Sequence, residues 1–145
     1  MMIRVYLDNC CYNRPFDNKG NLLVRLEAEA KLHIQQMIKD GELELVWSYL
    51  MDFENDANPY TERRDRIALW QGIAKFDIEE NENILETAHK LEKIGLREKD
   101  SLHIACAVFS KAEYFITTDK KILNKTIDSI TVINPIDFLR RYYNG

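Results

Sequence analysis

The sequence predicts an α/β fold, a three-layer α/β/α sandwich around a central, mostly parallel sheet. Short apolar strands alternate with longer helices along the chain, which is typical of parallel strands joined by helical crossovers. The chain has 145 residues, of which 46% are hydrophobic. This is enough for one core and too little for a second domain, so a single domain over residues 1–145 is expected.

The first strand is predicted at residues 3–7, an apolar run that ends at Asp8. A long helix at 22–39 follows, with Gly41 at the usual position for a helix end. A second strand is predicted at 43–47. Ser48 is then a good N-cap for a short helix running towards Asn55.

Helices are predicted next at 61–75 and 81–94, after Asn58-Pro59 breaks the short helix. A helix at 99–111 is apolar on most sides and should lie against the core. The rest of the chain is expected to form, in order, a strand at 113–117, a short helix from Lys120, a strand at 129–133 and a closing helix at 136–143.

The composition narrows the functional classes. The net charge of −4 gives no overall attraction to nucleic acid, so a polyanion would be held by local basic patches and bound metal. Residues 63–66, 120–125 and 140–141 are candidate patches, although each could equally be a solvated helix face. No apolar run reaches the length of a membrane span and no signal sequence is visible, so a cytoplasmic protein without a membrane partner is expected.

The cysteines are Cys10, Cys11 and Cys106, without C-x-x-C spacing, and we expect reduced thiols. Cys10 and Cys11 follow Asp8 but have no base partner visible in the sequence. They are expected to pack beneath the site. No glycine-rich nucleotide-binding motif occurs.

Four acids are the candidate site residues: Asp8, Glu54, Asp100 and Asp119. Asp8 and Asp119 directly follow strands, and open α/β sheets bind ligands beyond those strand ends. At about 5 Å and an effective dielectric of about 20, two carboxylates repel by about 3 kcal/mol. A cluster of acids therefore predicts divalent cations between them.

Three of the four acids have a competing interpretation. Glu54 falls about 40° from Leu50 around the helix axis and so shares the inward face, whereas Asp52 lies about 160° away. Its carboxylate could instead reach solvent. Asp100 and Asp119 could simply cap the helices that they begin.

Two further residues could support the site. His103 lies one helical turn from Asp100 and could face the same cleft, or could be an ordinary packed histidine. Thr118 could hydrogen-bond an acid or a metal-bound water, or could reflect β propensity alone.

The helix at 61–75 carries more apolar surface than a covering helix needs, at Ile67, Leu69, Trp70, Ile73 and Ala74. This surface could be core or a homodimer face, and we favour core.

Acids without a serine or cysteine triad indicate oxygen-ligated Mg²⁺ or Mn²⁺. Such ions activate water, neutralise a phosphate and stabilise a leaving oxygen. Phosphodiester hydrolysis uses all three effects.

The chain resembles a PIN domain over nearly its whole length. The resemblance is carried by Asp8 after an apolar strand, by the inward Glu54, and most specifically by the segments KDSLHIA (99–105) and YFITTDKK (114–121). Many members carry Thr or Ser after the first acid and Asn or Ser next, whereas this chain has Asn9 and Cys10. The departure affects only the hydroxyl contact that many members make near the first acid. The acid itself, Asp8, is present.

The resemblance implies a metal-dependent ribonuclease of the kind found as the toxin in bacterial toxin-antitoxin pairs, with an RNA substrate and an antitoxin partner. It implies that the four acids hold one or two Mg²⁺ or Mn²⁺ ions, and that Thr118 is the polar residue before the last acid. In the leading hypothesis three acids ligate the metal and Glu54 ligates it or orients the attacking water. The alternative is a catalytically inactive PIN-like module that binds a protein or RNA.

Overall fold

The computed structural model describes residues 2–12 and 21–144. Within them, five strands form one sheet in the order β3-β2-β1-β4-β5, and every pairing is parallel. The strands are β1 (Ile3–Leu7), β2 (Leu43–Ser48), β3 (Phe76–Ile78), β4 (Tyr114–Ile116) and β5 (Thr131–Ile133). The predicted parallel α/β/α architecture is confirmed.

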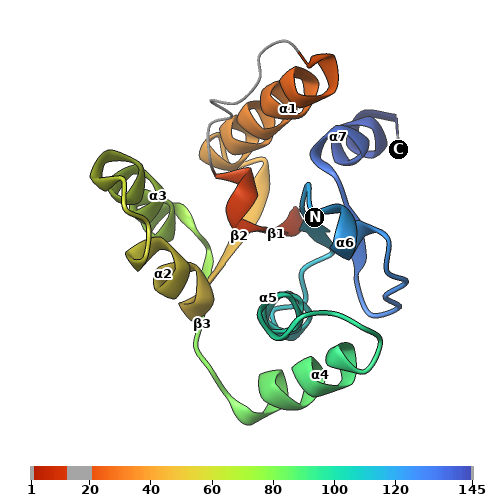
Figure 1. Ribbon diagram of the computed structural model, residues 1–145. Coiled ribbons are helices and arrows are strands. Elements are labelled where there is room, and N and C mark those ends of the chain that lie inside the picture. Colours follow the sequence, from red (N-terminus) through yellow and green to blue (C-terminus); the bar gives the residue numbers. More distant parts are fainter. Residues whose placement is uncertain (1, 13–20, 145) are drawn as a thin grey trace.

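Helices cover both faces of the sheet (Figure 1). One face packs on α1 (Leu22–Lys39), α3 (Thr61–Ile73) and α7 (Pro135–Asn144), and the other on α4 (Glu82–Glu92) and α5 (Glu98–Phe109). Successive strand residues point to opposite faces, so Val5 and Leu7 enter one core while Tyr6 enters the other. Both faces are therefore apolar, as expected for a buried parallel sheet.

Three short helices follow strand ends: η1 (Asn9–Cys11) after β1, α2 (Tyr49–Asp56) after β2 and α6 (Lys120–Leu123) after β4. The chain runs from β1 to β2 and β3 on one side, whereas β4 and β5 lie on the other side of β1. The strand order therefore reverses between β1 and β4. In open α/β sheets a ligand crevice forms beyond the strand ends at such a reversal.

The expected elements are present, with small differences at their ends. The strand at 3–7 and the helix at 22–39 have the predicted bounds. Strand β3 was not predicted, because Asp77 interrupts its apolar residues, so it lacks the apolar run that marks the equally short β4 and β5. Ser48 precedes α2 as predicted, but its hydroxyl does not cap the helix.

The apolar surface of α3 divides between core and solvent. Ile67 and Trp70 are buried, as predicted, whereas Leu69 is 70% and Ile73 is 41% exposed. The core interpretation is therefore wrong for Leu69 and Ile73. At 100° per residue, Leu69 lies about 160° from Ile67 around the helix axis, and Ile73, the last residue of α3, lies about 120° from it, so both turn away from the sheet.

Among residues 2–12 and 21–144, no helix combines the length and the apolar character needed to cross a membrane.

Candidate active site

The four predicted acids line one pocket of about 420 Å³ beyond the ends of β1 and β4. They come from four separate parts of the chain: the end of β1, helix α2, the first turn of α5 and the loop after β4. The other side chains lining the pocket are Cys10, Arg97, Lys99 and Thr118. The fold thus gathers acids that lie far apart in the sequence, from Asp8 to Asp119.

Asp8 is held by neutral donors. Its Oδ1 accepts a hydrogen bond from the Asn9 N–H at 2.8 Å, and its Oδ2 accepts one from the Thr117 hydroxyl at 2.7 Å. None of the ion pairs among the described residues includes Asp8. Burial raises the pKa of Asp8, although the charge of His103 and the Thr117 hydrogen bond act in the opposite direction. A buried carboxylate without a counter-cation is costly unless a cation is bound beside it.

Glu54 is strongly enclosed, with 7% of its side chain exposed. It contacts His103 Nε2, and Lys99 Nζ lies 3.4 Å from its Oε1. Burial alone would raise the pKa of Glu54, but the hydrogen bond and charge of His103, together with Lys99, lower it. Its carboxylate is therefore ionised at neutral pH. Of the acids of α2, Glu54 is the one that lines the pocket.

His103 belongs to a buried hydrogen-bonded chain. The Tyr6 hydroxyl lies 2.6 Å from His103 Nδ1 and 2.6 Å from Ser48 Oγ. In the charged form of His103, which is the form that lowers the pKa of Glu54, Nε2–H donates to Glu54 and Nδ1–H donates to the Tyr6 oxygen, and the Tyr6 hydroxyl in turn donates to Ser48 Oγ. This assignment satisfies every member of the chain. The predicted role of His103 beside the acids thus has a structural basis, since it fixes the orientation of Glu54.

Asp100 and Asp119 share one cation, Arg97. Arg97 Nε lies 2.8 Å from Asp100 Oδ2, and its Nη2 lies 3.2 Å from Asp119 Oδ2. The N-cap of α5 is Arg97, so the capping interpretation of Asp100 is wrong. For Asp119 that interpretation is correct, because its Oδ1 accepts the N–H of Lys121 at 2.9 Å and caps α6.

These cations explain the spacing of the acids. In the part of the chain that the structure describes, no three acidic, histidine or cysteine side chains converge closely enough to hold a metal ion as they stand. Asp100 and Asp119 are drawn to Arg97, and Glu54 is drawn to His103 and Lys99. The donor set itself fits Mg²⁺ or Mn²⁺, since it consists of carboxylate oxygens and includes Asp8, which has no ion pair among the described residues.

The threonines and cysteines are arranged differently from the sequence expectation. The Thr118 hydroxyl donates to Cys10 Sγ at 3.3 Å, and it is Thr117 that bonds an acid. Cys11 is buried as expected, whereas Cys10 lines the pocket. A hydrogen bond with Cys11 lowers the pKa of the Cys10 thiol to about 7. Asn9 contributes its main-chain N–H to the site, and its Oδ1 has no partner among the described residues.

Three contributors were missed from the sequence: Tyr6, Arg97 and Lys99. Two of them carry a signal that could have been used. Arg97 stands three residues before Asp100, a spacing that pairs charges on a helix. Tyr6 places a hydroxyl inside an apolar strand, and a buried hydroxyl needs a hydrogen-bond partner.

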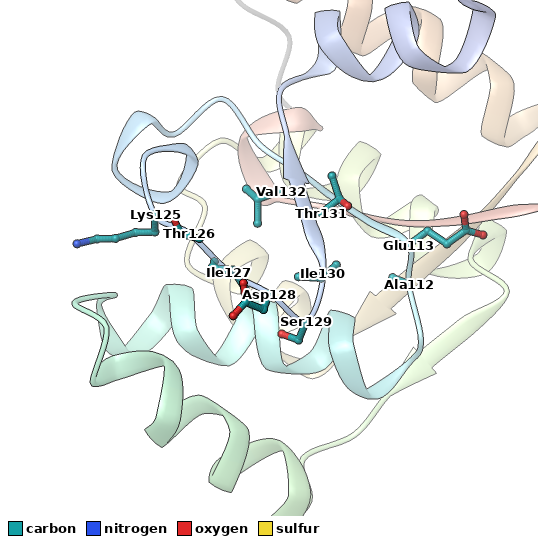
Figure 2. Close-up of a pocket in the computed structure, with 10 residues that line it drawn as sticks. All are labelled: Ala112, Glu113, Lys125, Thr126, Ile127, Asp128, Ser129, Ile130, Thr131 and Val132. Atoms are coloured by element: carbon teal, nitrogen blue, oxygen red, sulfur yellow. The ribbon is translucent and has the colours of Figure 1, made fainter. Parts of the chain in front are cut away.

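A second pocket, of about 570 Å³, lies before the start of β4 and β5, away from the acids. Figure 2 shows its lining residues, with Glu113 and Lys125 at opposite sides. Its two acids, Glu113 and Asp128, lie apart and do not form a comparable cluster.

No family model matches the sequence, and no curated protein matches it. Among solved structures, the chain is similar to one from the crystal structure of VapBC2 from Rickettsia felis bound to a DNA fragment from their promoter. The TM-score is 0.59 and the identity 13%, and the match covers 91% of this chain and 98% of that one. The likeness extends over nearly the whole domain and supports the PIN-like fold expected from the sequence.

Proposed function

We propose that this PIN-like domain is a metal-dependent endoribonuclease that hydrolyses phosphodiester bonds through Asp8, Glu54, Asp100 and Asp119. The observation that carries the proposal is the meeting of these acids in one pocket at the reversal point of the sheet. Asp8 supports it most, because this carboxylate is partly buried without a counter-cation among the described residues. Its cost to the fold is explained if it serves to bind a cation.

A divalent ion bound there would supply positive charge to activate water and to stabilise phosphate oxygens. Asp8, Asp100 and Asp119 would hold the ion. Glu54, ionised and oriented by His103, would hold the ion or orient the attacking water and accept its proton. Thr117 and the Asn9 N–H keep the Asp8 oxygens directed into the pocket.

The biological setting that we propose is a toxin-antitoxin pair, with single-stranded RNA as substrate and a small antitoxin protein as partner. The similarity to the fold of a VapBC2 chain supports this setting. The exposed Leu69 and Ile73 leave apolar surface that an antitoxin or a second copy of the chain would cover. The cytoplasmic location remains a prediction from the sequence.

The proposal is tested by incubating single-stranded RNA with the protein and Mg²⁺ or Mn²⁺, beside Asp8→Asn and Asp119→Asn. Asp137→Asn is the matched control, because Asp137 is an acid on α7 outside the pocket. We expect cleavage that stops with a chelator, falls at least ~100-fold in the pocket variants and is unchanged in the control. Equal cleavage by the wild type and Asp8→Asn would identify a contaminating nuclease and reject the proposal.

A second candidate is an inactive PIN-like module that binds a protein partner or RNA. One observation favours it: three of the four acids already have cationic partners within the chain. Binding of RNA without cleavage, together with no uptake of Mn²⁺ at millimolar concentration, would select this candidate over the nuclease.

A further inference from the structure

We propose that Arg97 is a phosphate-binding residue of the acid pocket. Its side chain pairs with Asp100 and Asp119 until a metal ion displaces it. The inference rests on the proposed function, because it assigns Arg97 to the same pocket and to an RNA phosphate. It concerns a side chain that is neither an acid nor a metal ligand.

The guanidinium of Arg97 bridges two of the acids. It contacts Asp100 at 2.8 Å and Asp119 at 3.2 Å, and so connects the first turn of α5 to the loop after β4. A divalent ion ligated by the same two carboxylates would need the place that the guanidinium now fills. The ion and the guanidinium are both positive, so binding of one disfavours the other.

The Arg97 side chain is free to move away from the acids. The Arg97 side chain is 61% exposed, although it makes both ion pairs. Its residue is the N-cap of α5, with an extended backbone, and lies outside both core clusters. Exposed ion pairs contribute little stability and are weakened by salt, so Arg97 can leave the acids without disturbing the core.

A phosphate is the ligand that the displaced guanidinium would bind. A guanidinium offers five N–H donors in a planar fork that matches a phosphate, and only two of them are used on the acids. When Asp100 and Asp119 ligate the ion, Arg97 remains at the mouth of the pocket, where RNA must enter. In a chain of net charge −4, this cation supplies local attraction for a phosphodiester.

Calorimetric titration with Mn²⁺ tests the displacement, without any readout of activity. The variants are Arg97→Ala and Arg97→Lys, and the control is Arg140→Ala. Arg140 pairs with Asp137 at the same i,i+3 spacing, with its side chain 69% exposed, on α7. We expect Arg97→Ala to bind Mn²⁺ about three- to tenfold more tightly than the wild type, and Arg140→Ala to be unchanged.

Fluorescence anisotropy with a labelled single-stranded RNA in Ca²⁺ tests the second half of the inference. Arg97→Ala should bind this RNA at least ~fivefold more weakly, with a salt slope smaller by about one, and Arg97→Lys should recover part of the loss. Circular dichroism and urea unfolding establish that each variant is folded.

Two results would overturn the inference while leaving the proposed nuclease intact. One is unchanged or weaker Mn²⁺ binding by Arg97→Ala. The other is RNA binding by Arg97→Ala that equals the wild type. If the wild-type protein itself binds no Mn²⁺, the failure belongs to the proposed function, and the two cases are thereby separated.

Discussion

The Thr117 hydroxyl donates a hydrogen bond to Asp8 Oδ2 at 2.7 Å, and Thr117 Oγ1 accepts the main-chain N–H of Asp119 at 3.0 Å. This fully buried side chain therefore links the ends of β1 and β4, which are paired strands in the sheet. It fixes the spacing of two acids that lie on different segments.

Replacement of Thr117 by valine should lower the affinity for Mn²⁺ by about tenfold, as is usual when a residue behind a metal ligand is lost. Thr118→Val is the matched control, because that hydroxyl contacts Cys10. Calorimetric titration measures both. Thr117→Ser should restore binding, since it returns the hydroxyl, and equal losses in the two valine variants would refute the role of Thr117.

Replacement of Asp8 by asparagine should stabilise the metal-free protein while it abolishes cleavage. Burial raises the folded pKa of Asp8 above its usual 3.8. The contribution of Asp8 to the free energy of unfolding is thus most favourable below pH 3.8. It is lost as the pH rises through the folded pKa. At pH 7 we expect a gain of about 1 kcal/mol in the free energy of unfolding, measured with urea in a chelator, and no gain below pH 3.8.

A loss of stability at pH 7 would contradict this prediction. It would mean that the charge of Asp8 serves the fold.

Glu54 should show the opposite pH dependence. Its folded pKa lies below the usual 4.5, because the hydrogen bond and charge of His103 outweigh burial. The stability that it contributes is present above pH 4.5 and disappears as the pH falls through the folded pKa. Glu54→Gln should therefore be about 1–2 kcal/mol less stable than the wild type at pH 7, and this difference should shrink in acid.

Urea unfolding at several pH values measures the effect of Glu54→Gln. Glu62→Gln is the control, because Glu62 is exposed and lies 3.9 Å from Arg66. A pH-independent difference for Glu54→Gln would reject the assigned role of His103.

Tyr6→Phe should cost about 1–3 kcal/mol in the free energy of unfolding, because it leaves His103 Nδ1 without its partner in the core and removes one hydrogen bond of Ser48. Tyr49→Phe is a matched control. The Tyr49 hydroxyl is buried without a partner among the described residues, so its removal should be neutral or stabilising. Similar losses for both variants would show that the hydrogen-bonded chain contributes nothing.

The sequence was sufficient for the site residues whose placement follows from local geometry. Asp8 ends an apolar strand, so its position at the sheet edge follows from the strand alone. Helical phase separates Glu54, which lies in the pocket, from Asp52, which accepts the Trp47 Nε1–H at 2.9 Å. In both cases the period of a single element decides where the side chain lies.

The contacts between elements could not be predicted in this way. Arg97 reaches Asp119 only because α5 packs near the end of β4, 22 residues away along the chain. Thr117 and Thr118 are adjacent and follow the last residue of β4, where strand alternation no longer determines which hydroxyl faces Asp8. Strand β3 forms because β2 offers an edge, and its central Asp77 leaves no apolar run that would predict it.

The most direct test of the metal site is a calorimetric Mn²⁺ titration of the wild type, Asp8→Asn, Asp119→Asn and the control Asp137→Asn. The acid cluster predicts binding by the wild type and the control, and a loss of at least ~tenfold in affinity in each pocket variant. Binding that is equal in all four proteins, or absent from the wild type at millimolar Mn²⁺, would contradict the claim that these acids form a metal site.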